Sequence, residues 1–356
     1  MHTLLTIIAL LIVLGVVDFV HEAGHFMAAR WAGVRVDAFS IGFGPALLKW
    51  TDKHGTIWKL CCLPLGGYVS IYGQEDMFHR KKYADLPKAK KVGHYLSAPA
   101  WKQFIIIAAG VFMNFVLAWL IYSADFMFRP RAVQLPIVGQ VIQGSVAFNA
   151  GIKPGDEIMK INNAHIDNWG DLIIAKELSS EHDANVLVAR KDKLITIQLK
   201  PVKPTERWGL VADGSTKTEA KTKPFFNALY SGLRETYHQS KNLLIVLKQI
   251  IVGERSSKQL GSFITIAQFS GQALEAGLFA FLAIIALISV NLGIINLLPL
   301  PVLDGGYLLI LFIEAIIRRK LDGKAMDIVI ICGWVLIMLL FLFTMWNDIA
   351  RVFGLN

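Results

Sequence analysis

The chain has little charge and few cysteines for its length. Only 18% of its 356 residues are Asp, Glu, Lys or Arg, whereas 54% are hydrophobic. This composition is too apolar for two water-soluble domains and predicts a membrane protein in contact with a lipid bilayer. Three cysteines, two of them adjacent, exclude a disulfide framework. The net charge of +9 comes without a basic stripe interleaved with aromatics, so nucleic acid is not an expected partner.

Four apolar runs are long enough to cross a bilayer, which requires about 20 helical residues. They lie near 3–20, 103–124, 277–298 and 328–346. The first run has no basic leading segment and no small-residue cleavage site, so we interpret it as a retained helix and not as a secretory signal. Lys and Arg gather between the first two runs and between the last two. These loops are therefore expected in the cytoplasm, with both chain ends outside it.

The segments between the apolar runs differ in composition. Residues 36–72 are apolar, β-prone and interrupted by Gly and Pro, which is typical of strands or re-entrant loops packed against a helix bundle. Residues 129–222 mix charges, turn signals and alternating apolar residues, and 224–252 has the spacing of one or two amphipathic interfacial helices. The expected parts are a first transmembrane helix at 1–32, a membrane-associated β region at 33–76, a basic cytoplasmic loop at 77–102, a second transmembrane helix at 103–128, a soluble β-rich domain at 129–222, an amphipathic interfacial segment at 223–275, a third transmembrane helix at 276–306, a cytoplasmic loop at 307–326 and a fourth transmembrane helix with the C-terminus at 327–356.

A cluster of ionisable residues lies in the first run. His21 and His25 of the sequence HEAGH are four residues apart and share one helix face, so both can bind one zinc ion. Glu22 lies beside them and can take a proton from an attacking water. Because each ionisable group inside a bilayer costs roughly 2.5–3.5 kcal/mol on insertion scales, such a cluster indicates a function. Asp18, one turn earlier, either orients a ligand histidine or faces an aqueous cavity, and the sequence leaves both readings open.

A second set of polar residues lies in the third run. The stretch 289–306 reads SVNLGIINLLPLPVLDGG, and its two prolines are expected to unwind the helix. Asp304 offers the carboxylate oxygen that completes a set of two histidines and one carboxylate for catalytic Zn²⁺. Asn291 and Asn296 are candidates for holding an unwound substrate by hydrogen bonds. An isolated Leu-Asp-Gly-Gly would instead be a simple turn after a kink.

HEAGH followed by NLLPLPVLDGG is similar to the paired signature of the site-2 protease family, and the likeness extends over nearly the whole chain through LPLGGYVSIYG and FTMWNDIARV. The resemblance is strongest to the bacterial sigma-E-regulating branch. It implies an intramembrane zinc metalloendopeptidase of the bacterial inner membrane. Its implied substrates are single-span proteins, for example an anti-sigma factor or remnant signal peptides. It also implies that the β region, at Gly67 and Tyr68, binds substrate as an added strand.

The stretch VGQVIQGSVAFNAGIKPGDEIMKINNAHIDNWGDL resembles a PDZ domain, which binds peptide termini and would screen substrates on the extracytoplasmic side. A spacer is the simpler reading. The chain departs from the family pattern in having room for only one such domain and in carrying Ala23 where a bulky apolar residue is usual. A third departure is Gly110 to Asn114, where the family has G-P-x-x-N. Asn114, an intramembrane amide in a neighbouring span, is a candidate oxyanion donor or a candidate for orienting a ligand histidine.

The predicted fold class is an α-helical polytopic membrane protein with four transmembrane helices, a membrane-associated β segment and one inserted α+β PDZ domain. The predicted activity is zinc-dependent hydrolysis of peptide bonds in transmembrane segments. The alternative is a non-catalytic, membrane-anchored PDZ scaffold. A metal transporter would need polar residues continuing along a path through the bilayer, and the sequence has only the cluster. Seven other histidines are expected on the surface: His2, His54, His79, His94, His165, His182 and His238.

Overall fold

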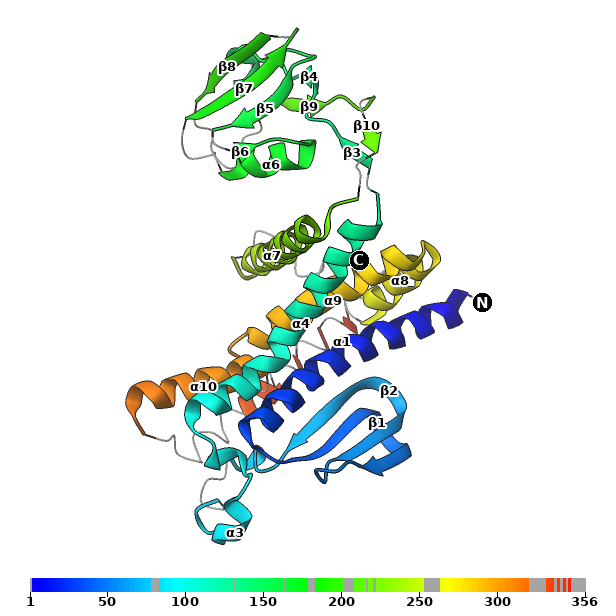
Figure 1. The fold of residues 1–356 in the computed structure, drawn as a ribbon, viewed down its shortest axis with the longest axis vertical. Helices are drawn as coiled ribbons and strands as arrows, with labels where there is room; N and C mark the ends of the chain where they lie inside the picture. Colours follow the sequence, from blue (N-terminus) through cyan, green and yellow to red (C-terminus); the bar gives the residue numbers. More distant parts are fainter. Residues whose placement is uncertain are drawn as a thin grey trace. The chain divides into compact units, whose positions relative to one another are not determined.

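The computed structural model divides the chain into two compact units, which we call the membrane unit (Met1–Asp125 with Pro224–Asn356) and the inserted unit (Phe126–Lys223). Figure 1 shows their helices and strands. The structure describes all residues except 1, 78–82, 131, 163, 179–182, 192, 201–207, 216, 220–221, 253–262, 302, 320–330, 336–337, 340–341, 344 and 347–356.

Helices make up most of the described part of the membrane unit. Its elements outside the sheet are α1 (His2–Ala32), α3 (Lys88–Lys91), α4 (Ala100–Phe128), α7 (Phe225–Val252), α8 (Phe263–Glu275), α9 (Leu278–Leu297), α10 (Asp304–Ile317) and the short turns Glu75–Met77 and Tyr95–Ser97. Within the described residues, α1, α4 and α9 are long and apolar enough to cross a membrane. The prediction of a membrane protein is thereby confirmed. The fourth predicted span, in 327–356, lies largely outside the described residues.

The three long helices pack along apolar faces. Val17 of α1 and Ile285 of α9 belong to one buried cluster, and Ala118 of α4 belongs to another shared with α9. Gly24 lets α1 approach α4 closely, because a Cβ at this position would lie 2.4 Å from the carbonyl oxygen of Ala109. This close contact brings the polar residues of α1 next to those of α4.

One sheet flanks α1 in the membrane unit. It is formed by β1 (Val36–Thr51) and β2 (Ile57–Ile71), which pair with each other. Residues 38–41 of β1 pair with 67–70 of β2 and also with 57–60 of β2. Because a strand has only two edges, 38–41 lie in the centre of the sheet and the end of β2 lies beyond them. This last part of β2 contacts α1, as the hydrogen bond between Val69 and Glu22 shows.

Two features differ from the sequence-based expectations. Residues 307–317, expected in a cytoplasmic loop, belong to α10, whose Leu308 and Leu311 are buried in a cluster with Ile106 of α4. The prolines end α9 at Leu297, and a new, shorter helix starts at Asp304. This second helix is too short to be recognised as a transmembrane run. His94, expected on the surface, is fully buried, with its Nε2 3.1 Å from a carboxylate oxygen of Asp76.

The inserted unit is an α+β domain with its own core. Its elements are β3 (Ala132–Gln134), β4 (Val138–Val141), α5 (Val146–Asn149), β5 (Glu157–Ile161), β6 (Ala164–His165), α6 (Trp169–Leu178), β7 (Ala184–Arg190), β8 (Lys193–Leu199), β9 (Leu210–Ala212) and β10 (Lys217–Glu219). An antiparallel sheet has the order β6-β5-β7-β8, while β3 pairs with β10 and β4 with β9. Ile158, Val186 and Leu199 fill the core. Asp156 is fully buried and receives two hydrogen bonds from Arg190, at 2.6 and 2.7 Å.

Candidate metal centre and active site

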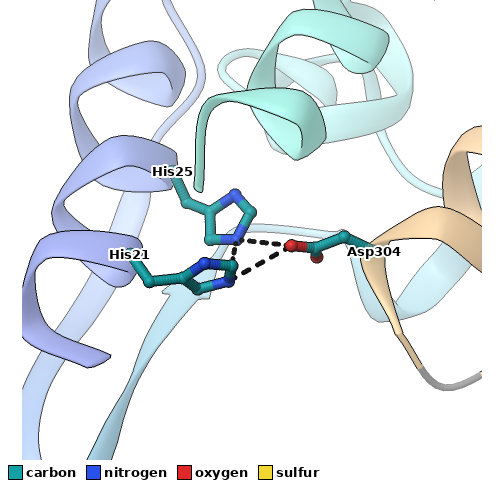
Figure 2. A group of neighbouring side chains, drawn as sticks. All are labelled: His21, His25 and Asp304. Atoms are coloured by element: carbon teal, nitrogen blue, oxygen red, sulfur yellow. Dashed lines mark hydrogen bonds and ion pairs between the residues drawn. The ribbon is translucent and has the colours of Figure 1, made fainter. Parts of the chain in front are cut away.

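Two histidines of α1 and one aspartate of α10 meet inside the membrane unit. His21 and His25 are both buried, and their Nε2 atoms lie 3.1 Å apart. Oδ2 of Asp304 lies 3.2 Å from Nε2 of His21 and 3.4 Å from Nε2 of His25. Figure 2 shows the three side chains pointing toward one common point. The structure thus brings together the three residues that the sequence predicts as metal ligands.

The spacing of the three donor atoms fits a tetrahedral metal ion. Zinc binds His nitrogen and carboxylate oxygen at about 2.0–2.2 Å, so neighbouring ligands of a tetrahedral site lie about 3.3 Å apart. The three donor–donor distances of 3.1, 3.2 and 3.4 Å match this value. Oδ2 of Asp304 is buried without a hydrogen-bond partner, as a metal ligand would be. The residues present therefore fit a zinc ion.

The opposite nitrogen of each histidine is also engaged. Nδ1 of His25 lies 2.8 Å from the carbonyl oxygen of Ile106, so it must carry the proton and donate it. The lone pair of its Nε2 therefore faces the other two donors. Nδ1 of His21 lies 3.2 Å from the side-chain amide of Asn114. Oδ1 of Asn114 is buried without a hydrogen-bond partner. If the amide is oriented with this oxygen toward Nδ1 of His21, the protonated Nδ1 donates a hydrogen bond to it, and both groups are satisfied.

Gly110 of α4 leaves room for both histidine rings. A Cβ at this position would lie 2.4 Å from Nε2 of His25 and 2.9 Å from Cε1 of His21. Real side-chain carbons do not approach other atoms this closely, so any larger residue would displace the rings. Gly110 and Asn114, one turn apart, thus give α4 the space and the polar contact that the histidines need.

Glu22 follows His21 on α1 and contacts the sheet. Its Oε2 accepts a hydrogen bond of 2.9 Å from the backbone N–H of Val69 in β2. The carboxylate is therefore held by the sheet instead of rotating freely beside the histidines. This arrangement suits a base, which must stay ionised and aimed at a reacting proton.

The remaining predicted residues lie at different places. Asp18 has no hydrogen bond to either histidine among the described residues, and Nδ1 of each histidine has another partner. Gly67 and Tyr68 lie in the last part of β2, where the Tyr68 hydroxyl accepts a hydrogen bond from Lys59. Asn291 and Asn296 are both half-buried on α9. Five helical residues correspond to about 140° at about 100° per residue, so the two amides leave the helix on different sides.

Three contacts of the site were not predicted from the sequence. The carbonyl of Ile106 and the N–H of Val69 are backbone groups, for which no residue type gives a signal. Gly110 was noticed only as part of an altered motif. A glycine is required there because α1 approaches α4 closely and places two histidine rings against this position. The sequence alone does not show which helices lie next to each other.

The fold and the site together define a membrane protein with a candidate metal centre and an adjacent carboxylate. The model of Peptidase family M50 matches residues 9–340. The chain belongs to this family, the site-2 proteases, and the resemblance seen in its sequence is confirmed.

Relatives match the chain over nearly its full length, and each carries a provisional name as a zinc metalloprotease. A protein of Rhizobium meliloti is 34% identical over 364 residues, covering 98% of this chain and 97% of its own. A protein of Rickettsia conorii is 33% identical, with coverage of 99% and 100%. A protein of Campylobacter jejuni is also 33% identical, with coverage of 98% and 94%.

Proposed function

We propose that this membrane peptidase is a zinc-dependent endopeptidase that cleaves single-span membrane proteins within the bilayer. The observation that carries the proposal is the meeting of three metal-type donors in the membrane unit, two of them on α1, a helix that is long and apolar enough to span a membrane. Buried electron-rich atoms at 3.1–3.4 Å repel one another unless a proton or cation lies between them. A polar cluster with this geometry supports metal-dependent catalysis over a purely structural role.

Zinc is the metal proposed for His21, His25 and Asp304. Peptidase family membership, the names of the relatives and the donor set of two nitrogens and one oxygen all agree with it. A zinc ion at this site supplies Lewis-acid activation of water and of the scissile carbonyl. Three protein ligands leave a fourth position open, which is the pattern of catalytic and not structural zinc.

The protein groups around the metal perform the remaining tasks. Glu22, aimed by the N–H of Val69, takes a proton from the attacking water and passes it to the leaving amine. The carbonyl of Ile106 and the amide of Asn114 hold His25 and His21 in the tautomers that present Nε2 to the metal. We therefore assign Asn114 to positioning His21, ahead of the alternative role of oxyanion donor.

Substrate binding involves the sheet and one face of α9. An unwound transmembrane segment would add as a strand beside Gly67 and Tyr68, which lie next to the Val69–Glu22 contact. On α9, Phe281 and Ile285 pack toward α1, whereas Ala286 and Val290 pack toward α4. At about 100° per residue, Asn296 falls between these two sides and Asn291 falls on the opposite side. Asn296 is thus the better placed of the two to reach a substrate.

The inserted unit would recognise peptide termini as a PDZ domain. Its small antiparallel sheets with the helix α6 and the Gly- and Asp-containing turn before β5 support this assignment. A terminus exposed by an earlier cut outside the cytoplasm would bind to a sheet edge. We propose that this unit and both chain ends lie on the extracytoplasmic side of a bacterial inner membrane, as the basic loops indicate. Cleavage would then release a cytoplasmic fragment, in the manner of regulated intramembrane proteolysis.

The test is cleavage of a single-span reporter by the full chain purified in detergent. Wild type is compared with Glu22→Gln, and the zinc content of both is measured by mass spectrometry. Cleavage by wild type alone, with zinc in both proteins, supports the proposal. Equal cleavage by Glu22→Gln would overturn the assigned base, and stoichiometric zinc without any cleavage of several reporters would favour the PDZ scaffold.

A further inference from the structure

The face of α1 that carries Glu22 lies alongside the last part of β2. A Cβ on Gly15 would lie 4.0 Å from the carbonyl oxygen of Pro64, and Glu22 bonds to the N–H of Val69. Between these two contacts lies Asp18. A Cβ on Gly67 would lie only 3.1 Å from its Oδ2, so the carboxylate lies directly against the backbone of this strand.

Asp18 lacks a hydrogen-bond donor within the described residues of the protein. Its Oδ2 is buried without a partner. An ionisable group at this depth costs roughly 2.5–3.5 kcal/mol on insertion scales, and an unpartnered buried oxygen adds to that cost. A Leu or Val here would fit the apolar helix better, so the acid is not explained by stability.

The metal site does not supply the missing donor. Nδ1 of His25 is bonded to the carbonyl of Ile106, and Nδ1 of His21 contacts Asn114. Both Nε2 atoms face Asp304. The donor for Asp18 must therefore come from outside the described protein groups, and the surface that Asp18 faces is the stretch of β2 where we place the substrate.

We propose that Asp18 is a specificity-determining residue that accepts a hydrogen bond from a donor side chain of the substrate. This inference rests on the proposed function. The favoured substrates carry a polar donor, such as Asn, Gln, Ser or Thr, close to the scissile bond in an otherwise apolar segment. A segment without a donor leaves the oxygen of Asp18 unpartnered and binds less well.

Helix and strand geometry predicts where this donor lies. Asp18 and Glu22 are four residues apart, which is about 6 Å along a helix. Two residues of an extended strand span about 6.6 Å and point their side chains to the same face. The donor should therefore lie about two residues from the bond that is cleaved, on one side of it only.

The experiment compares two single-span reporters that differ by Asn against Leu, which have similar shapes. The substitution is placed two residues before or two residues after the cleaved bond. The ratio of kcat/KM for the Asn and Leu reporters is measured for wild type, Asp18→Leu and Asp18→Asn. We expect wild type to favour Asn about tenfold at one of the two positions, and the Asp18→Leu ratio to fall to about one. Asp37→Leu, which removes an exposed acid of β1, is the matched control and should keep the wild-type ratio.

Binding provides a second measurement that does not depend on turnover. In the Glu22→Gln background, the Kd of the Asn and Leu peptides is measured with and without Asp18→Leu. Tighter binding of the Asn peptide that disappears in the double variant supports the inference, whether or not the reporters are cleaved. If no reporter is cleaved, the proposed function fails while this inference stands. An unchanged Asn-to-Leu ratio in Asp18→Leu overturns it. Loss of bound zinc in Asp18→Leu, with both reporters affected equally, would also overturn it and assign Asp18 to the metal site.

Discussion

Glu22 of α1 and Val69 of β2 are joined by a hydrogen bond of 2.9 Å between a side-chain carboxylate and a backbone N–H. This bond links the helix that carries two of the proposed metal ligands to the strand where we place the substrate. The position of the base relative to a bound peptide is therefore set by main-chain geometry. A change at either end should alter catalysis without altering metal binding.

Val69→Pro should lower kcat/KM about 10- to 100-fold while zinc content stays at the wild-type level. Proline removes the N–H that Glu22 accepts, and a hydrogen bond to a charged group contributes about 1.5–3 kcal/mol. Proline is tolerated where the lost N–H does not pair within the sheet. Val69→Ala keeps the N–H and is the control. Equal activity of the two variants would show that this bond does not aim Glu22.

Gly110→Ala should abolish stoichiometric zinc binding. The added Cβ would lie 2.4 Å from Nε2 of His25, so the ring must leave the position in which it faces Asp304. Metal content of the purified protein measures the effect. Gly15→Ala, also in a long helix, is the matched control because its Cβ would meet only one atom, at 4.0 Å. Full zinc content in Gly110→Ala would mean that the histidines have room that the structure does not provide.

Asn114→Ala should weaken zinc binding about 10- to 100-fold, which is the usual effect of removing a group that orients a ligand histidine. Competition with a chelator of known affinity measures the change. Ser289→Ala is the control for helix packing, because the Ser289 hydroxyl donates to the backbone carbonyl of Asn114 and not to its side-chain amide. If both variants lose zinc equally, packing between α4 and α9 would be the cause.

Asp156→Ala should destabilise the inserted unit by about 1.5–3 kcal/mol. It removes a fully buried carboxylate and leaves Arg190, which still donates to the carbonyl of Gly151, without its two hydrogen bonds to Asp156. Hydrogen exchange of residues 126–223 in the full chain reports this change. Asp167→Ala, which disrupts an exposed pair with His165, should have an effect below about 0.5 kcal/mol. Protection equal to wild type in Asp156→Ala would contradict the prediction.

The turn between β1 and β2 should loosen in acid. Burial opposes ionisation of Asp52, but hydrogen bonds from the N–H groups of Thr56 and His54 outweigh it and lower its pKa to about 2 from an ordinary value of 3.8. Because the folded-state pKa is depressed, the resulting stability is fully present above about pH 4 and is lost as the pH falls through 2.

Fluorescence of Trp50 and Trp58, whose rings stack beside this turn, measures the acid transition between pH 5 and pH 2. Wild type should show a transition in this range that is absent or much smaller in Asp52→Asn. Asp37→Asn, in an exposed pair with Arg35, is the control and should behave like wild type. A transition of the same size in Asp52→Asn would assign it to another group.

The proposed metal ligands could be predicted from the sequence because an ionisable side chain in an apolar run differs from its neighbours. His21, His25 and Asp304 are such residues, and the structure brings all three together. The positions of Asn291 and Asn296 on α9 were equally visible. Their different directions follow only once the helix faces that contact α1 and α4 are known.

Other features of the fold depend on tertiary contacts that cannot be predicted from residue types. Residues 307–317 were expected in a loop because the 14 residues of α10 are too few to cross a bilayer and the basic residues Arg318 and Arg319 follow them. His94 looked like a surface residue because its partner Asp76 lies in a different turn. Asp18 could be recognised as unusual, but the strand it contacts is distant in sequence, so its direction could not be inferred.

The proposed ligands of the metal centre lie far apart in the chain, with two histidines in α1 and the aspartate in α10. During synthesis the first helix therefore enters the membrane with an incomplete set of ligands. The site can close only after the residues between α1 and α10 have been translated and α10 has packed against α4. A newly made molecule is thus inert toward its neighbours in the membrane until its own folding is almost finished.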